Sequence, residues 1–181
     1  MLFNSHIFIF LFLPISVIVF FFLNRMRLIE ASKGFLVLAS LFFYSWWNVL
    51  YLPLILVSML FNYIIGTSLT KNKEHRKVSK KYLLTIGILI DLGLLGYFKY
   101  MDFFIANLNF IVGTRIPFFH LALPLAISFF TFQQITYLVD SYRNETKEYD
   151  FLQYAIFVSF FPQLIAGPIV NHKEMMPQFS N

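Results

Sequence analysis

The most costly polar residue in this chain is Asp91, which stands midway through an apolar run at 82–98. A carboxylate at the centre of a membrane helix costs roughly 2.5–3.5 kcal/mol on insertion scales, so such a residue is expected to face other protein. It could relay protons or contact a substrate, or it could be a protonated or hydrogen-bonded packing residue. Gly87, Gly93 and Gly96 around it would allow another helix to approach closely.

A second polar pair, Gln133 and Gln134, lies inside the apolar run at 123–139, with Ser128 and Thr131 nearby. Carboxamides in such a position can line a pore or funnel, and they can equally form hydrogen bonds between packed helices. By helical spacing, Gln134 shares one face with Thr131, whereas Gln133 lies on another face. The residues alone leave both interpretations open.

The third candidate is a proline-interrupted segment at 151–170. Pro162, Gly167 and Pro168 fall in its second half and should break a helix there. Irregular backbone at membrane depth persists only where protein or a water-filled cavity satisfies its polar groups. We therefore predict a broken or re-entrant element facing the protein interior, with an ordinary kinked spanning helix as the alternative.

Four further polar residues lie in or near helix ends. Gln163 would bring an amide donor and acceptor into the broken segment, suited to an acyl carbonyl or a sugar hydroxyl. His172 follows that segment, and we interpret it as interfacial rather than catalytic. Asp140 and Arg143 are three residues apart and most simply pair with each other. No metal site is predicted, because no histidine has a partner at ligand spacing and the chain has no cysteine.

The composition of the 181-residue chain is that of a membrane protein. Hydrophobic residues make up 59% and charged residues 13%, against about 45–50% and roughly 25% in soluble domains. A soluble domain of this size could not bury so much apolar surface. Soluble enzymes, disordered tails and disulfide-rich secreted scaffolds are therefore excluded.

Apolar runs separated by polar loops predict the membrane spans. We place spans at about 7–23, 34–47, 49–69, 82–98 and 123–139, followed by the broken segment at 151–170. The predicted fold class is all-α, a polytopic transmembrane helical bundle in one membrane domain over 1–181. The mixed stretch at 101–119 is predicted to be interfacial or outside.

The positive charges predict the orientation of this bundle. Most of the 14 Lys and Arg residues follow the first span, fill the loop at 70–81, or follow the span at 123–139, and this threading places all three groups on one side. The positive-inside rule makes that side cytoplasmic and the N-terminus outside. The net charge of +5 is thus interpreted as a topology signal beside lipid headgroups, so the predicted partner is the lipid bilayer and not nucleic acid.

Four stretches resemble the bacterial membrane-bound O-acyltransferase (MBOAT) family, especially its alginate and peptidoglycan O-acetyltransferase branch. They are LFFYSWW at 41–47, LGLLGYFKY at 92–100, LPLAISFFTFQQITYLVDSYR at 123–143 and FFPQLIAGPIV at 160–170. The resemblance implies a multi-pass protein of the cytoplasmic (inner) membrane with a ring of helices around a funnel. It also implies that an acetyl group passes from a cytoplasmic donor, acetyl-CoA or another acyl donor, to an extracytoplasmic polysaccharide or partner acetyltransferase.

The same resemblance places the catalytic machinery elsewhere. The family's intramembrane catalytic histidine is expected beyond Asn181, the last residue of this sequence, and none of the four histidines here occupies its motif. We therefore expect no catalytic residue and no bound cofactor in this chain, which would be the N-terminal part of the enzyme and inactive alone. The family often has Asn where Asp91 stands, which favours a neutral structural role for that residue.

The candidate site residues fall into two groups. The funnel or substrate candidates are Gln133, Gln134, Gln163, Gly167, Pro168 and His172. The structural polar residues are Asp91, Asp140 and Arg143. The alternative functions are a transporter or channel subunit, indicated by the intramembrane polar residues, and a membrane scaffold without chemistry.

Overall fold

The structure is a computed structural model of the chain, and it describes residues 5–70, 79–145 and 150–166. Every regular element within these residues is helical, which confirms the all-α prediction. The elements are η1 (Phe8–Phe12), α1 (Leu13–Arg25), α2 (Ile29–Trp47), η2 (Val49–Tyr51), α3 (Leu52–Thr70), α4 (Lys80–Leu95), η4 (Gly96–Tyr100), α5 (Met101–Val112), α6 (Ile127–Tyr142), α7 (Phe151–Ser159) and α8 (Phe161–Ala166).

Within the described residues, three helical stretches are long and apolar enough to cross a membrane. They are Phe8–Arg25, Val49–Thr70 and Lys80–Val112, and they contain most or all of the spans predicted at 7–23, 49–69 and 82–98. The two other predicted spans also correspond to helices with shifted bounds, α2 beginning at Ile29 and α6 covering 127–142. The total of about five spans and the side of the N-terminus stay predictions.

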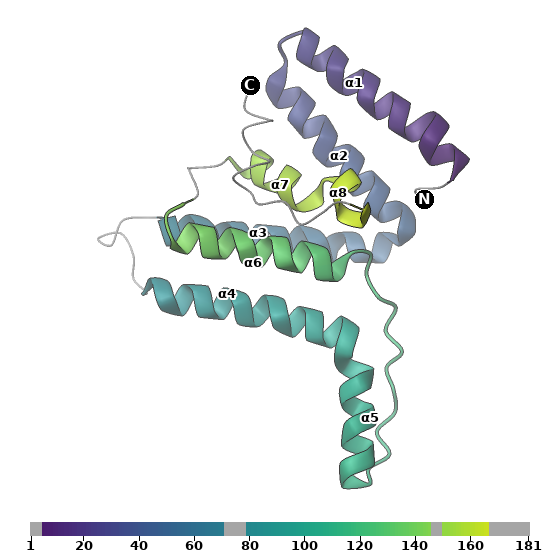
Figure 1. Cartoon of the computed structure of the whole chain (residues 1–181), viewed down its shortest axis with the longest axis vertical. Coiled ribbons are helices and arrows are strands. Elements are labelled where there is room, and N and C mark those ends of the chain that lie inside the picture. The colour runs from purple at the N-terminus through teal and green to yellow at the C-terminus, as the bar shows by residue number, and fades with distance from the viewer. Residues whose placement is uncertain (1–4, 71–78, 146–149, 167–181) are drawn as a thin grey trace.

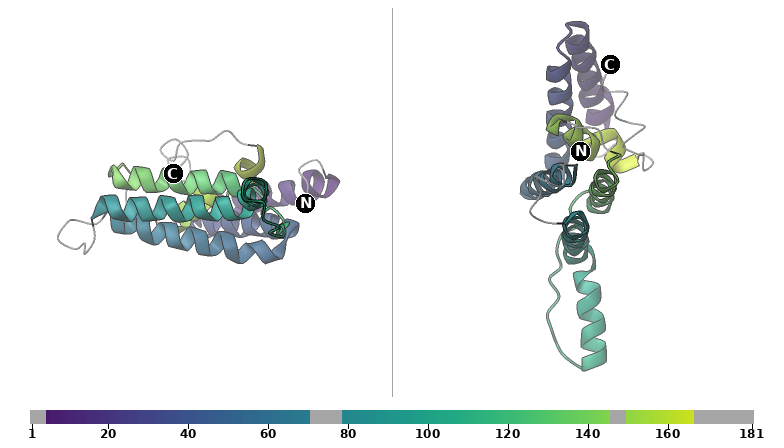
Figure 2. Two further views of the ribbon diagram at one scale, coloured as in Figure 1. Left: turned by 90° about the horizontal axis from the view of Figure 1, so that it is seen from below. Right: turned by 90° about the vertical axis from the view of Figure 1, so that its left-hand side faces the viewer.

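The centre of the bundle is made by α3, α4 and α6, which lie side by side in Figures 1 and 2. Helix α6 packs against both α3 and α4, α7 packs against α2, α3 and α6, and α1 packs on α2 at the edge. The largest fully buried apolar side chains of the main core come from α2, α3, α6 and α7. They include Tyr44, Ile55, Met59, Phe130, Leu138 and Phe157.

Two glycines allow α6 to lie very close to its neighbours. A Cβ atom on Gly66 of α3 would overlap the Tyr137 ring, and one on Gly87 of α4 would lie 2.6 Å from Cδ1 of Leu138. Small residues at helix contacts are the usual means of close packing in membranes. Among the described residues, a Cβ on Gly93 or Gly96 would meet nothing within 4 Å, so no described helix lies against these two glycines.

Polar contacts tie the helix ends together in two groups. At one end, Lys80 Nζ at the start of α4 donates to Asn144 Oδ1 after α6 over 2.6 Å. At the other end, Lys99 Nζ in η4 donates to Ser128 Oγ at the start of α6 over 3.0 Å, and the Tyr51 hydroxyl donates to the Ala122 carbonyl. The α4 start and the α6 end therefore share one side of the bundle, as the predicted threading requires.

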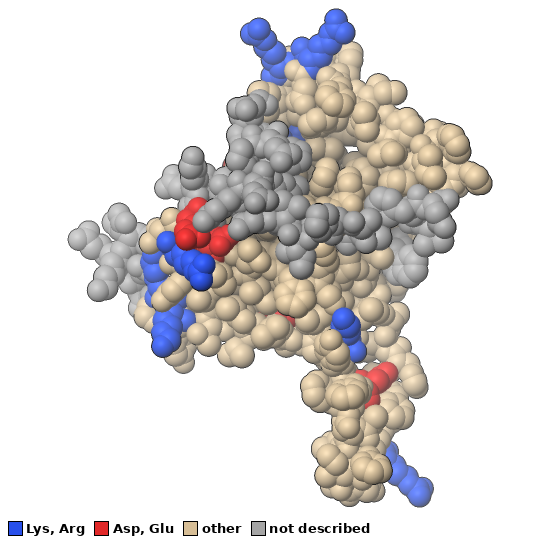
Figure 3. Space-filling model, in the orientation of Figure 1, with Lys and Arg blue, Asp and Glu red and all other residues tan. Residues whose placement is uncertain are grey.

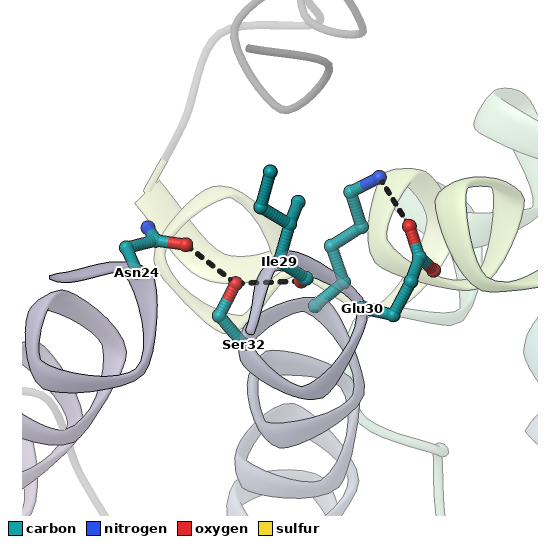
Figure 4. Close-up of polar contacts among 5 residues, drawn as sticks. Asn24, Ile29, Glu30 and Ser32 are labelled. Atoms are coloured by element: carbon teal, nitrogen blue, oxygen red, sulfur yellow. Dashed lines mark hydrogen bonds and ion pairs between the residues drawn. The ribbon is translucent and has the colours of Figure 1, made fainter. Parts of the chain in front are cut away.

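A polar turn joins α1 to α2, as Figure 4 shows. Ser32 Oγ lies 2.7 Å from Asn24 Oδ1 and 2.7 Å from the Ile29 carbonyl oxygen. Lys33 Nζ lies 3.1 Å from Glu30 Oε1 in the next turn of α2. The Asn24–Ser32 contact joins the end of α1 to the start of α2, and the other two contacts lie within the first turns of α2.

Basic side chains gather at the helix ends. Arg25 and Arg27 are exposed at the α1–α2 turn, and Lys81 and Arg143 are exposed at the start of α4 and the end of α6. In Figure 3, blue side chains lie over these ends, and two further ones lie near the α4–α5 turn and at the far end of α5. The basic loop predicted at 70–81 lies mostly outside the described residues.

Helix α4 does not continue straight into α5. The π-helical turn η4 lies between them, and Tyr100 at its end has φ −117° and ψ 2°, outside the helical region. Local π-helical turns are a recognised cause of sharp kinks. As a result, α5 turns sharply away from the bundle in Figures 1 and 2.

Candidate functional site

The described part of the proline-containing segment holds two short helices, and whether the whole segment is re-entrant or spans the membrane stays a prediction. Helix α7 ends at Ser159 and α8 begins at Phe161, because Phe160 between them has a non-helical backbone with φ −54° and ψ 107°. Pro162 is the second residue of α8, where a missing N–H removes no helical hydrogen bond. The 9 residues of α7 extend only about 14 Å, against the roughly 30 Å of a hydrocarbon core.

The break is held by α2. The Phe161 N–H donates to Ser40 Oγ over 3.2 Å, and both residues are buried. Ser40 Oγ in turn donates to the Leu36 carbonyl over 2.7 Å within α2. A helix begun at membrane depth leaves unpaired N–H groups that need a protein partner, and Ser40 supplies one of them.

Aromatic rings enclose the start of α8. The Phe161 ring centroid lies 5.2 Å from that of Phe12, 5.7 Å from that of Phe43 and 6.1 Å from that of Phe8. These rings come from η1, α2 and α8, so the break joins the N-terminal helix pair to the rest of the bundle. Phenylalanine residues from separate helices thus form the contact that holds the start of α8.

A buried polar cluster joins the three central helices α3, α4 and α6. Asn62 Nδ2 donates to Asp91 Oδ1 over 2.8 Å and lies 3.1 Å from Gln134 Oε1. Ser58 Oγ donates to the same Gln134 oxygen over 2.6 Å. Asn62 and Gln134 are fully buried, and Asp91 is 3% exposed.

Asn62 is the centre of this cluster. Its amide nitrogen also lies 3.1 Å from the Ser58 carbonyl oxygen of its own helix, so its two hydrogens serve acceptors on three helices. Among the described residues, Asp91 Oδ2, Asn62 Oδ1 and Gln134 Nε2 have no hydrogen-bond partner. The cluster joins the three helices through donors on Asn62 and Ser58 and acceptors on Asp91 and Gln134.

Ser58 and Asn62 were not among the residues singled out from the sequence, although a signal for them existed. Both are polar residues in the apolar run at 49–69, and Ser58, Asn62 and Gly66 recur every fourth residue. That spacing places them on one face of a helix, which is the face that α6 contacts.

The structure separates the two adjacent glutamines. Gln134 belongs to the polar cluster, whereas the buried Gln133 lies one turn before Tyr137 on the other face predicted for it. The Tyr137 ring lies 4.4 Å from that of Tyr154 in α7, measured between centroids. Gln133 thus shares the face of α6 that turns towards α7.

Gln163 is buried in α8, where its backbone N–H donates to the Phe160 carbonyl over 3.1 Å and closes the first turn after the break. Helix α8 packs on α2. The start of α8 is therefore held by α2, whereas the polar cluster lies between α3, α4 and α6.

Several candidate site residues predicted near the C-terminal end of the sequence lie outside the described residues. These include the site candidates Gly167, Pro168 and His172, and the stretch that follows them as far as Asn181. The catalytic histidine expected beyond Asn181 lies outside the printed sequence altogether. Its position and role therefore stay a prediction from the family resemblance.

Asp140 and Arg143 occupy different environments at the end of α6. Asp140 is 7% exposed, whereas Arg143 is exposed. The pair expected between Asp140 and Arg143 stays a prediction.

Comparison with known proteins gives matches over the whole of the chain. It is 44% identical to a peptidoglycan O-acetyltransferase of Helicobacter pylori. It is 37% and 39% identical to proteins named probable alginate O-acetylase AlgI in Pseudomonas aeruginosa and Pseudomonas putida. The chain is a homologue of these O-acetyltransferases. The predicted resemblance to peptidoglycan and alginate O-acetyltransferases is confirmed over the whole length of the chain.

The aligned region is a limited part of these relatives. The chain spans 39% of the Helicobacter pylori protein and 35% and 37% of the two Pseudomonas proteins. No family model and no solved structure matches the chain.

Proposed function

We propose that this chain forms part of a membrane O-acetyltransferase that moves acetyl groups from a cytoplasmic donor across the membrane. The acceptor would be an extracytoplasmic polysaccharide such as peptidoglycan or alginate, reached directly or through a partner acetyltransferase. The observation that carries the proposal is identity of 37–44% over the whole chain to proteins named peptidoglycan O-acetyltransferase or probable alginate O-acetylase.

Within that enzyme, the described helices would form the wall of the transfer path rather than its reactive centre. A transfer path through a membrane needs polar groups that do not collapse into lipid, and here such groups are held between helices by Asn62 and Ser40. We assign Gln133 and Gln163 to the path, and Asp91 and Gln134 to the wall that supports it. The donor, acetyl-CoA or another acyl donor, enters as a substrate from the cytoplasm.

The alternatives predict different cellular outcomes. A transporter or channel subunit would carry a substrate through vesicles without acyl transfer, and a scaffold would copurify with partners without affecting acetylation. The acyltransferase interpretation is supported over both by the relatives, since all three compared here are named for O-acetyl transfer.

The test is deletion of the full-length gene, followed by measurement of ester-linked acetate on cell-wall and secreted polysaccharides. We expect acetate to be lost from one of these polymers and restored by the wild-type gene on a plasmid. The polymer that loses acetate identifies the acceptor. Unchanged acetate on both polymers would contradict the proposal.

A further inference from the structure

Helix α5 and the extended arm that follows it form a projection from the bundle, which we call the finger (residues 101–120). Residues 80–100 of α4 and η4 already cover about 31 Å at roughly 1.5 Å per residue, the thickness of a hydrocarbon core. The finger begins at the sharp turn after that length and runs sideways from the end of α4 (Figure 1). It is therefore available for a role other than crossing the membrane.

The finger satisfies its own backbone with two polar side chains of α5. Asn109 accepts from the Ile116 N–H through Oδ1 and donates to the Ile116 carbonyl through Nδ2, both over 2.9 Å. Asp102 accepts from the Phe119 N–H over 2.9 Å and from the His120 N–H over 3.1 Å. Side-chain partners for extended backbone matter most where water is scarce, because unpaired N–H and C=O groups are costly there.

With these polar groups turned inward, the outer surface of the finger is strongly apolar. Phe110 is 90% exposed and Ile111 is 77% exposed. Further large side chains that are more than half exposed are Phe103, Phe104, Val112 and Phe119. So much exposed aromatic surface on one small element indicates an apolar partner.

The charges of the finger region lie at its two extremities. Lys99 stands just before its base with Asp102 in the first turn of α5, and Arg115 follows the turn at Gly113 at its far end. Figure 3 shows one blue side chain projecting at that end. Cations at both ends of an apolar element complement the anionic headgroups of a bilayer surface. A helix that enters the hydrocarbon core would instead place Arg115 among lipid tails.

We propose that the finger lies in the membrane interface at the C-terminal end of α4, with phospholipid headgroups and the upper acyl chains as its partner. In the predicted orientation this is the outer leaflet, the side on which an extracytoplasmic acceptor is modified. The finger then anchors the outer end of α4 laterally, beside the Lys99–Ser128 contact that joins η4 to α6. This inference rests on the proposed membrane location of the enzyme and not on its acetyl transfer.

The test uses the full-length protein in vesicles of phosphatidylethanolamine and phosphatidylglycerol, with single nitroxide labels. The printed sequence has no cysteine, so Phe110→Cys and Phe103→Cys each provide one label site once any cysteine elsewhere in the full chain is replaced. Matched controls are Leu89→Cys, 62% exposed in the middle of α4, and Lys81→Cys at the helix start. Relaxation by dissolved oxygen and by a water-soluble nickel chelate measures the depth of each label.

We expect both finger labels to have an oxygen-to-nickel accessibility ratio between those of Leu89→Cys and Lys81→Cys. A ratio equal to that of Leu89→Cys would overturn the proposal by placing the finger in the hydrocarbon core. A water-like ratio, or protection from both reagents by protein, would overturn it as well. Because depth is measured without acetyl transfer, this result is independent of the proposed enzymatic activity.

Discussion

Asn62 Nδ2 of α3 donates a hydrogen bond to Asp91 Oδ1 of α4 over 2.8 Å, in a position where both side chains are buried. The same nitrogen lies 3.1 Å from Gln134 Oε1 of α6. One carboxamide thereby connects three helices, and the Ser58–Gln134 hydrogen bond adds a second polar link between α3 and α6. The buried carboxyl group of Asp91 therefore takes part in the packing of these helices.

Replacing Asn62 with leucine should lower the stability of the protein. The variant leaves the Asp91 and Gln134 oxygens without this donor, and a buried polar group left unpaired costs about 1–3 kcal/mol. We expect a lower thermal midpoint of the purified full-length protein in detergent. The matched control is Asn107→Leu in α5, where the exposed amide contacts only the Phe103 carbonyl of its own helix. Equal midpoints for the two variants would contradict the central role of Asn62.

Two substitutions distinguish the hydrogen-bonding role of Asp91 from a role of its ionisable carboxyl group. Asp91→Asn keeps an oxygen that accepts from Asn62, whereas Asp91→Leu removes the acceptor. If the residue is structural, Asp91→Asn retains acetylation of the polymer in cells, and Asp91→Leu reduces it together with the amount of folded protein.

A role of Asp91 as a proton relay requires the opposite pattern. Asp91→Asn would then lose activity as completely as Asp91→Leu while its amount in the membrane stays normal. Ester-linked acetate and immunoblots of the membrane fraction distinguish the two results.

Close packing of α6 should make Gly66 intolerant of any side chain. A methyl group there would overlap the Tyr137 ring, and overpacking of this kind costs typically about 1–3 kcal/mol. We expect Gly66→Ala to lower the thermal midpoint and Tyr137→Leu in the same protein to restore part of it. Gly93→Ala in α4 is the control, because its Cβ meets nothing within 4 Å. A Gly66→Ala variant as stable as Gly93→Ala would show that α3 and α6 can separate without loss.

The helices were largely predictable from the sequence, since apolar runs of membrane length and their polar loops follow from the solvent alone. The break at Phe160 was also predictable, because Pro162 cannot continue a helix. What the sequence could not show was partner choice. Nothing in the spacing of Asp91 indicates that its donor is Asn62, 29 residues earlier, because contacts between helices depend on how each helix is rotated and tilted.

The turn between α4 and α5 could not be predicted from the sequence either. Helical elements follow one another without a loop from 80 to 112, and together they are long and apolar enough to cross a membrane. The π-helical turn at 96–100 and the non-helical backbone of Tyr100 redirect the chain, and no proline marks that point. The mixed polarity of 101–119 predicted an interfacial or outside stretch, whereas its helical half at 101–112 became visible only in three dimensions.

The orientation of the bundle is open to a direct test. Reporter fusions after Arg27 and after Lys81 should both indicate the cytoplasm, because the basic residues at these helix ends retain the loops on that side. A fusion after His120, at the end of the finger, should indicate the outside. Opposite signals at Arg27 and Lys81 would show an odd number of crossings between them and overturn the predicted threading.

The contact between Ser40 and the break provides the last prediction. Ser40→Ala removes the acceptor of the Phe161 N–H and leaves a buried donor without it, at a cost of about 1–3 kcal/mol. Because this N–H begins α8, the variant should shift the segment that carries Gln163 and lower acetylation more than it lowers the amount of protein. Ser45→Ala is the control in the same helix, since Ser45 Oγ contacts carbonyls of α2 alone. If both variants retain full acetylation, the position of the broken segment does not depend on Ser40, and its anchoring must come from the ring of phenylalanines around Phe161.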